Sequence, residues 1–449
     1  MIKERILAYS DRISAAPGES VEIKVSAPES GEYTARLIRL ISGDEGPSGP
    51  GFKAEDIASP IARGYPGLFQ RVPSGSHVSF HKAGPQLSGS FTLLAMIWPT
   101  LPAKGSPQAI LGNFDAANRS GCSLLIDASG RLAVQIGDNH VVHLPAALID
   151  RNWYLVSVAV DAAAGLLTLR QNALHHRGPG KAVTEVTVPL DSTIGSLMRI
   201  GEGVGGPFRI AAWSAGEIAS AHYNGKIDSP AVAARALTAD EVEQLGRGGA
   251  KANVGALLAA WDFSRDISGI TIEDVSGSGH HGRIVNLPAR AMKGWNWNGS
   301  EYDWTKKPEH YGAIHFHDDD LYDCEWETDF VWEVPAGLKS GIYCIHLTQQ
   351  GKDGTYEEYV PICVRPAAGQ KKAKLALLIP TASYWAYANQ QMPTSWTFNE
   401  LSMGVFETMT EVDRYLEEHP GLGMSVYDNH SDGSGVCYSS SLRPILNMR

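Results

Sequence analysis

Short segments that alternate apolar and polar residues recur along most of this chain, with turn residues between them. Residues 20–26, Ser-Val-Glu-Ile-Lys-Val-Ser, and residues 33–40, Tyr-Thr-Ala-Arg-Leu-Ile-Arg-Leu, are the first two examples. Successive side chains of a strand point to opposite faces, so this period of two predicts strands with one buried face. Two strands are not stable alone in water, which means that their partners must lie elsewhere in the chain.

Residues 328–366 contain three further apolar runs that are separated by turn residues. The runs are 330–334, 341–347 and 359–365. Short antiparallel strands joined by turns are the building blocks of a β-sandwich. We therefore predict a discontinuous immunoglobulin-like sandwich formed by residues 1–65 and 300–366, with a whole domain inserted between its early and late strands.

Residues 66–250 are predicted to form this inserted domain as a jelly roll, because turns separate strand-like runs throughout them. The runs are 91–98, 121–127, 131–136, 153–160 and 165–170. The segment Tyr223-Asn-Gly-Lys-Ile-Asp228, followed by an expected helix over 236–245, resembles the laminin-G-like, concanavalin-like family. Thr238 and Glu241 have the spacing of a capping box for that helix. No aromatic platform or calcium-type carboxylate cluster is recognisable, so a scaffold is favoured over carbohydrate binding.

Residues 251–299 are rich in glycine and tryptophan, as in Gly294-Trp-Asn-Trp297. They are too polar for a core helix and too aromatic for a flexible linker. We expect an ordered, irregular connector that packs between domains.

The composition excludes several classes of function. The chain has 449 residues, 43% of them hydrophobic and 19% charged, which is ordinary for a globular protein of two to four domains. A net charge of −11 and the lack of a basic patch argue against nucleic acid as a partner. No run of about 18 apolar residues predicts a membrane span. The first residues lack the apolar core of a secretory signal, so we expect a cytoplasmic protein.

The five cysteines are expected to be buried structural thiols. They are Cys122, Cys324, Cys344, Cys363 and Cys437. An odd number without C-x-x-C spacing argues against both a disulfide framework and a zinc knuckle.

The segment His315-Phe-His317-Asp-Asp-Asp320 is a candidate metal site. On a strand, His315 and His317 share a face, and histidine is a common ligand of transition metals. The alternative is an exposed edge strand that runs into an acidic turn. We favour this alternative because no third ligand stands at a recognisable spacing.

The last part of the chain contains two tyrosine-rich stretches. The apolar run 374–379 predicts a buried parallel strand, and ligands bind at the carboxyl ends of such strands. Tyr384 and Tyr387 follow it and share a face if the stretch is helical. Residues 427–435 combine two carboxylates, an imidazole, two hydroxyls and two glycines, a density typical of a binding loop. We expect an incomplete α/β domain over 367–449, since a parallel sheet needs several βαβ units.

The sequence resembles the large (beta) subunit family of N,N-dimethylformamidase. The resemblance extends along most of the chain, and its specific part is Tyr384-Trp-Ala-Tyr-Ala-Asn389 together with the loop from Tyr427 to Ser440. It implies that the last domain is glutamine-amidotransferase-like and that the chain is truncated before the end of that catalytic domain.

The same resemblance implies an amidohydrolase that hydrolyses N-substituted formamides to formate and an amine through iron-bound hydroxide. Its mononuclear ferric ion (Fe³⁺) is held by two tyrosines and one glutamate. The tyrosines correspond to Tyr387 and Tyr427, with Tyr384 and Tyr438 as alternatives, and the glutamate has no counterpart in this chain. His430 and Asp428 are the expected catalytic residues, which would orient the water or transfer a proton.

The resemblance also implies a small partner subunit and a homo- or hetero-oligomer. A second hypothesis is that the chain is a catalytically incomplete homologue that serves as a carbohydrate- or protein-binding β-module. Iron in the purified protein would favour the enzyme, and a metal-free protein would favour the binding module.

Overall fold

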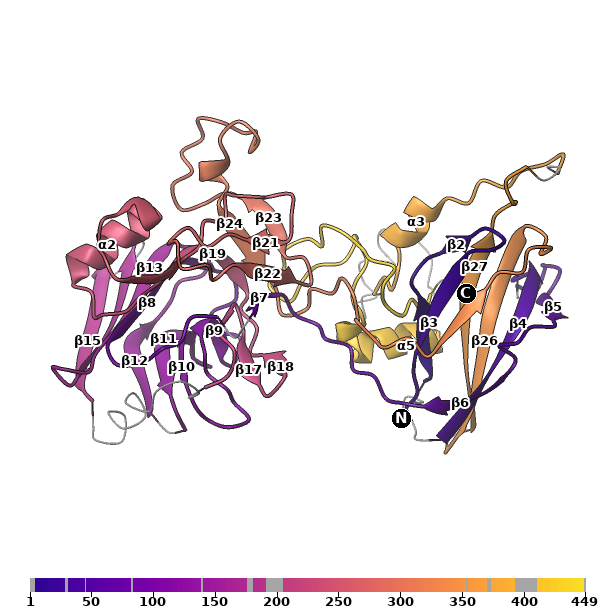
Figure 1. Ribbon diagram of the computed structural model, residues 1–449, viewed down its shortest axis with the longest axis horizontal. Helices are drawn as coiled ribbons and strands as arrows, with labels where there is room; N and C mark the ends of the chain where they lie inside the picture. Colours follow the sequence, from indigo (N-terminus) through magenta and orange to yellow (C-terminus); the bar gives the residue numbers. More distant parts are fainter. Residues whose placement is uncertain are drawn as a thin grey trace. The chain divides into compact units, whose positions relative to one another are not determined.

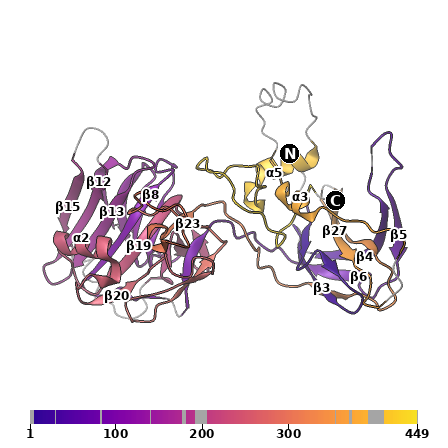
Figure 2. The same cartoon turned by 90° about the horizontal axis from the view of Figure 1, so that it is seen from above.

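A computed structural model describes most of the chain and divides it into two compact units (Figures 1 and 2). The described residues are 5–28, 31–44, 46–81, 84–138, 140–175, 181–190, 205–352, 354–369, 373–391 and 410–447. Strands predominate in both units. Within the described ranges, no helix has the length and apolar character needed to cross a membrane.

Unit 1 comprises residues 1–74, 321–429 and 434–449, and it contains two sheets. The smaller sheet has the order β1-β3-β25, and the larger has the order β2-β27-β26-β4-β5 with β6 paired to β4. These strands are β1 (Leu7–Ser10), β2 (Ser14–Ala15), β3 (Ser20–Ser26), β4 (Gly31–Ser42), β5 (Lys53–Ile57), β6 (Arg63–Gly67), β25 (Phe330–Glu333), β26 (Gly341–Gly351) and β27 (Gly354–Val364). Early and late parts of the chain are therefore neighbours within each sheet.

The alternating pattern of β3 explains how these strands build a core. Val21, Ile23 and Val25 are fully buried, whereas the residues between them are exposed or half-buried. Trp332 of β25 lies opposite Val21 in the antiparallel register and is buried in the same apolar cluster. Ile345 of β26 joins this cluster from the other sheet.

Unit 2 comprises residues 75–320 and 430–433 and contains two eight-stranded sheets. One sheet has the order β12-β11-β10-β9-β16-β7-β22-β21; the other has the order β15-β14-β13-β8-β19-β24-β23, with β20 paired to β19. The first sheet is formed by β7 (His77–Phe80), β9 (Gln108–Gly112), β10 (Cys122–Ile126), β11 (Arg131–Ile136), β12 (His140–Ala147), β16 (Arg209–Ile210), β21 (Thr271–Ile272) and β22 (Gly282–Val285). The second is formed by β8 (Phe91–Pro99), β13 (Tyr154–Asp161), β14 (Leu166–Ala173), β15 (Val183–Pro189), β19 (Gly225–Ala233), β20 (Leu257–Ala260), β23 (Ala289–Met292) and β24 (Ala313–Phe316). A short hairpin, β17 (Trp213–Ala215) and β18 (Ile218–Ser220), stands apart from both.

Strand β8 shows why unit 2 is layered. Leu93 and Ile97 point into the cluster between the two sheets, whereas Leu94 and Met96 point to the opposite face. Helix α2 (Ala239–Gly248) covers that opposite face through Leu245 (Figure 1). A strand that is buried on both faces reads as a continuous apolar run, which is how β8 appears in the sequence.

The predicted capping box of α2 is confirmed. The Thr238 hydroxyl accepts a hydrogen bond from the Glu241 amide at 3.3 Å, and the Glu241 carboxylate accepts one from the Thr238 amide at 2.9 Å. Arg235 holds the same carboxylate at 2.6 Å. These contacts satisfy amide groups that lack partners within the first turn of a helix.

The expected connector at residues 251–299 is not a separate segment. It supplies β20, β21, β22 and β23 to the two sheets of unit 2. Trp261 and Phe263 alternate with polar residues and are buried in the core between the sheets. The strands in this segment have only two to four residues and are surrounded by glycines and polar residues. They therefore show no recognisable periodicity in the sequence. Residues 313–316, expected in the sandwich, likewise form β24 of unit 2.

The predicted strand over residues 374–379 is also absent. This stretch has no regular secondary structure, and the side chains of Leu375, Leu377 and Leu378 are 89%, 77% and 92% exposed. A parallel strand forms only beside other strands, and no described strand pairs with this one. By contrast, residues further along form a regular helix, α5 (Glu411–Glu418), which begins after a capping box at Thr410.

None of the five cysteines, all of which lie in described parts of the chain, forms a disulfide. Cys122, Cys324 and Cys344 are buried, as expected, and Cys363 is half-buried. Cys437 is exposed, so the expectation of a buried structural thiol is wrong for this residue.

Replacement of Trp261 tests whether residues 251–299 are part of the core of unit 2. The Trp261 indole is 2% exposed, contacts Phe80 and Phe208, and donates a hydrogen bond to the His280 carbonyl at 2.7 Å. We expect Trp261→Ala to lower the free energy of unfolding of unit 2 by about 3–5 kcal/mol, because it leaves a cavity. Chemical denaturation followed by circular dichroism measures this change.

Trp304→Ala is the matched control for this prediction. Trp304 is 36% exposed, so its removal leaves little cavity, and we expect a change within about 0.5 kcal/mol. Equal effects of the two substitutions would contradict the placement of Trp261 in the core.

Candidate functional site

The first candidate site is the tyrosine pair, Tyr387 and Tyr427, in unit 1. Helix α3 (Thr381–Ala386) ends at Tyr387, and Tyr427 lies in a turn further along the chain. Their rings are stacked, with centroids 4.6 Å apart and an interplanar angle of 16°. The Val426 amide donates a hydrogen bond to the Ala386 carbonyl at 3.1 Å, so the two backbones are joined next to the tyrosines.

The two side chains of the tyrosine pair are open to solvent. Tyr387 is 46% exposed and Tyr427 is 61% exposed. The hydrogen bond to Tyr427, followed by the charge of that group, raises the pKa of Tyr387. Two phenol oxygens therefore lie side by side at the surface of unit 1, where a cation could contact both.

Arg443 organises the loops that carry the tyrosine pair. Arg443 is 1% exposed, and burial lowers its pKa to about 10, which still leaves it protonated at neutral pH. It donates hydrogen bonds to three backbone carbonyls, those of Leu422 at 2.8 Å, Met424 at 2.9 Å and Ala388 at 3.2 Å. Further bonds reach the Ser440 carbonyl and the Ser439 hydroxyl. Ala388 follows Tyr387, and Met424 precedes Tyr427, so one cation fixes both stretches.

Asn389 completes this hydrogen-bonded frame. Its side-chain oxygen accepts from the Leu446 amide at 2.8 Å, and its side-chain nitrogen donates to the carbonyls of Pro444 and Leu422 at 2.9 and 3.1 Å. Asn389 has a φ of 55°, in the left-handed region that asparagine tolerates better than most residues. Asn447 donates to the Tyr387 carbonyl at 2.8 Å.

The structure places the other predicted site residues as follows. Tyr384 is 47% exposed on α3, and Tyr438 is half-buried in an irregular segment. The Asp428 carboxylate accepts hydrogen bonds from the amides of Ser425 at 2.9 Å and Gln391 at 3.2 Å, so it holds the loop next to Tyr427. His430 belongs to unit 2 and the tyrosine pair to unit 1. The catalytic roles of His430 and Asp428 stay predictions.

The second candidate site is a cluster of histidines and aspartates in unit 2, here called the His–Asp cluster. Its members are His315, His317, Asp318, Asp319, Asp320, His430 and Asp432. His315 Nε2 lies 3.1 Å from Asp432 Oδ2, and His317 Nδ1 lies 3.2 Å from Asp320 Oδ2. His430 stacks on His317 and places its Nδ1 2.7 Å from Asp319 Oδ1.

The pKa values of His315 and His317 are shifted in opposite directions by burial and by the neighbouring groups. Burial lowers the pKa of His315 to about 4, although the hydrogen bond to Asp432 opposes this change. Burial also lowers the pKa of His317, but the hydrogen bond to Asp320 and the nearby carboxylates outweigh it, and the net shift is upward. The charge of His317 in turn lowers the pKa of His315.

Lys104 and Ser431 hold Asp318 at the edge of the cluster. Burial raises the pKa of Asp318, but these two partners outweigh burial and the net shift is downward. The Lys104 ammonium lies 2.5 Å from this carboxylate, and the Ser431 hydroxyl donates to it at 2.6 Å.

The preferred sequence interpretation of His315 and His317, an exposed edge strand, is wrong. Strand β24 lies between β19 and β23, and the two histidines are 5% and 3% exposed. The missing third group is Asp432, which comes from a distant part of the chain. The density of polar residues around His430 was its only sequence signal, and that signal did not indicate a contact with β24.

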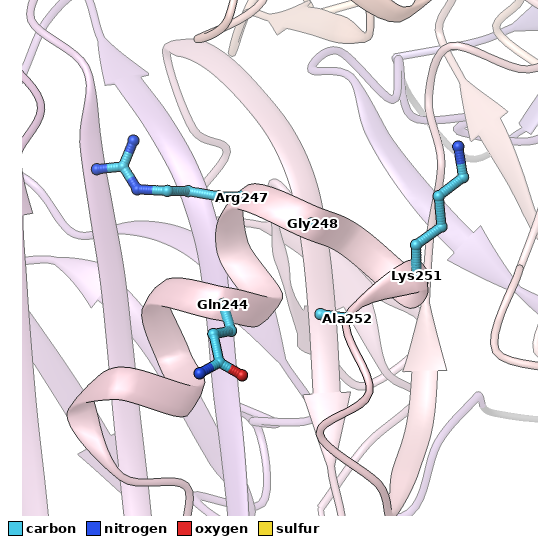
Figure 3. Close-up of a pocket in the computed structure, with 5 residues that line it drawn as sticks. All are labelled: Gln244, Arg247, Gly248, Lys251 and Ala252. Atoms are coloured by element: carbon cyan, nitrogen blue, oxygen red, sulfur yellow. The ribbon is translucent and has the colours of Figure 1, made fainter.

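A shallow hollow lies at the C-terminal end of α2 (Figure 3). Its volume is about 630 Å³, and it is lined by Gln244, Arg247, Gly248, Lys251 and Ala252. Neither the tyrosine pair nor the His–Asp cluster contributes to its lining, so it adds no chemistry to the candidate sites.

Comparisons with known proteins show what the chain is similar to. Residues 289–449 match the family model described as N,N-dimethylformamidase beta subunit-like, C-terminal. Two curated relatives, the N,N-dimethylformamidase beta subunits of Paracoccus aminophilus and an Alcaligenes species, are each 37% identical over 99% of this chain. The chain is thus similar over almost its whole length to these two beta subunits. It spans 60% of the length of each of these relatives.

Solved structures give a weaker similarity. A putative carbohydrate binding protein from Bacteroides ovatus aligns with 63% of this chain and 92% of its own, at 12% identity and a TM-score of 0.32. The CBM40 of the Ruminococcus gnavus IT-sialidase aligns with 38% of this chain and 96% of its own, at 14% identity and a TM-score of 0.29.

Arg443→Lys tests the frame around the tyrosine pair. Lysine lacks the planar set of donors, so buried carbonyls of Leu422, Met424 and Ala388 lose partners. We expect the local free energy of opening around residues 421–427 to fall by about 3 kcal/mol. Native-state hydrogen exchange of the corresponding peptides measures this change.

Arg365→Ala provides a control in the same unit. Arg365 pairs with Glu19 at 2.7 Å, but the two side chains are 53% and 43% exposed, so the loss should stay below about 1 kcal/mol. Unchanged exchange around Tyr427 in Arg443→Lys would contradict the role assigned to the guanidinium.

Proposed function

We propose that this chain is part of an iron-dependent amidohydrolase of the N,N-dimethylformamidase type, which hydrolyses N-substituted formamides to formate and an amine. The observation that carries this proposal is the tyrosine pair, two neighbouring phenols in the stretches that resemble the family most specifically. The relationship to subunits named for this activity supports it.

The tyrosine pair fits a hard, highly charged cation such as Fe³⁺. Phenolate oxygen is a hard anionic donor, and a nearby cation lowers the pKa of a phenol that otherwise titrates near about 10. Tyr387 and Tyr427 would therefore supply two ligands, and their exposure leaves room for a third protein ligand and for substrate. When bound, the metal would act as a Lewis acid that polarises the amide carbonyl and lowers the pKa of water.

The residues around the pair would position these two ligands. Arg443 and Asn389 hold the backbones on which Tyr387 and Tyr427 stand, and Asp428 fixes the turn beside Tyr427. Catalytic groups held by such bonds need little reorganisation during reaction. Transfer of a proton by His430 or Asp428 is part of this proposal.

We also propose the finer features of the fold and the assembly. The two-sheet core of unit 1 would be an immunoglobulin-like sandwich. Residues from 367 onward would belong to an α/β, glutamine-amidotransferase-like catalytic domain, which in a protein of the relatives' length would cover the exposed Leu375, Leu377 and Leu378. The relatives are named beta subunits, and we infer a small partner subunit for this protein as well.

Removal of single phenol oxygens tests the proposed ligands. In this chain extended to the length of its relatives, we expect Tyr387→Phe and Tyr427→Phe each to lower iron content and formate release from N,N-dimethylformamide by at least about 100-fold, because each removes a direct ligand. Elemental analysis and a formate assay measure the two quantities.

Tyr302→Phe, at a residue 76% exposed in unit 2, is the control and should retain both properties. Tyr384→Phe and Tyr438→Phe should also retain iron, which separates the assigned ligands from the alternatives. A wild-type protein without iron and without amidase activity would instead favour the binding-module hypothesis.

A further inference from the structure

We propose that His315, His317 and Asp432 form a binding site for a divalent transition-metal ion such as Zn²⁺, separate from the tyrosine pair. The three side chains converge within unit 2, and their ligand atoms lie within 4.8 Å of one another. Two imidazoles and a carboxylate are a donor set that zinc accepts.

The fold places the two histidines on one side at the end of β24, because His315 lies in the strand and His317 directly follows it. Ile314 and Phe316 point into the core between the sheets, so the residues that alternate with them point away from it. In the antiparallel register, His315 lies opposite Lys226 of β19 and Phe316 lies opposite Gly225. Strand β24 is paired on both sides, which restricts movement of the histidine backbone.

The distances between the donor atoms match a tetrahedral ion. His315 Nε2 and His317 Nε2 lie 3.1 and 3.7 Å from the same oxygen, Asp432 Oδ2. Two ligands of one tetrahedral zinc lie about 3.4 Å apart when each bond is about 2.1 Å long. A small adjustment of the Asp432 side chain would therefore bring both distances to the expected value.

A second triad of His317, Asp320 and His430 is also compact, but its rings are poorly oriented. The rings of His317 and His430 are parallel within 4°, with centroids 3.8 Å apart. Lone pairs lie in the plane of an imidazole, so those of stacked rings point in parallel planes and do not meet at one ion. The rings of His315 and His317 are tilted by 42°, which allows their lone pairs to converge.

Asp320 supports the first triad through a contact with the Nδ1 atom of His317. Its Oδ2 lies 3.2 Å from His317 Nδ1 and accepts a hydrogen bond from the Ser76 hydroxyl at 2.6 Å. If the Nδ1–H group of His317 donates a hydrogen bond to Asp320, the Nε2 atom of neutral His317 carries no proton. This basic nitrogen faces Asp432. A carboxylate on the far nitrogen of a ligating histidine is the usual arrangement at metal sites.

The burial of the three side chains indicates a structural role for the ion. The side chains of His315 and His317 are 6% and 3% exposed, and that of Asp432 is fully buried. Buried carboxylates are normally paired with cations or coordinate metals. A bound ion would join β24 to residues 430–433, two segments far apart in the sequence, and so anchor the later segment in unit 2.

Metal titration of the purified chain tests this site directly. After treatment with a chelator, the wild-type chain is titrated with Zn²⁺ alone by calorimetry, and with Co²⁺ alone while the visible absorption of tetrahedral cobalt is followed. We expect a single site per chain, and no binding of either ion would overturn the proposal. Zinc should also slow hydrogen exchange in peptides that cover residues 313–320 and 428–436.

Variants identify the ligands. His315→Gln and Asp432→Asn should weaken zinc binding by at least about 100-fold, and Asp320→Asn by about 10- to 100-fold, as for a supporting residue. His430→Gln is the matched control, because it removes a stacked histidine of the same cluster, and should bind within a few-fold of wild type. Loss of binding in His430→Gln with retention in His315→Gln would overturn the assignment.

The wild-type titration needs no variant, so a variant that fails to fold does not remove the test. Circular dichroism and thermal denaturation of each metal-free variant identify such a failure. Tyr387→Phe and Tyr427→Phe should leave zinc binding unchanged, so failure of the zinc site and failure of the proposed iron site are distinguishable.

Discussion

The buried Arg443 guanidinium is the interaction on which the candidate site of unit 1 depends. Transfer of an arginine cation out of water is costly unless its N–H groups find acceptors. Here it donates to carbonyls in three loop segments, at Ala388, at Leu422 and Met424, and at Ser440, and the same bonds fix the backbones next to the tyrosine pair. These hydrogen bonds offset the cost of removing the cation from water. The same bonds order loops that otherwise lack regular structure.

The two clusters of polar groups differ in a way that suits different tasks. Tyr387 and Tyr427 are open to solvent, so a further ligand and a substrate can reach their oxygens. The His–Asp cluster is buried, with the Asp432 side chain fully enclosed, which suits the joining of chain segments rather than turnover of a substrate. A catalytic metal needs open coordination positions, whereas a structural one is enclosed by the protein.

Much of the β-structure could be predicted from the sequence, because alternation is a local signal. Strand β3 has the predicted bounds, and the capping box at Thr238 forms as its spacing predicts. Residues 251–299 were misassigned because their strands are too short to show a period. The run at 374–379 was misassigned because an apolar run forms a strand only where neighbouring strands exist.

The candidate sites show the same division between local and long-range information. The resemblance identified Tyr387 and Tyr427, and the structure brings these two rings together. The sequence could not indicate that Asp432 contacts His315, because a single sequence carries no record of contacts between distant residues. Arg443 was also missed, since a buried arginine looks like any surface arginine in a sequence.

We propose that Tyr387 and Tyr427 together bind ferric iron as phenolates. The visible absorption spectrum of the iron-loaded, extended protein tests it most directly, because phenolate bound to Fe³⁺ gives a charge-transfer band that carboxylate or imidazole ligands do not give. We expect such a band in the wild type, and we expect it to weaken and shift when either tyrosine is replaced by phenylalanine. An iron-loaded protein without this band, or one whose band is unchanged in both variants, would contradict it.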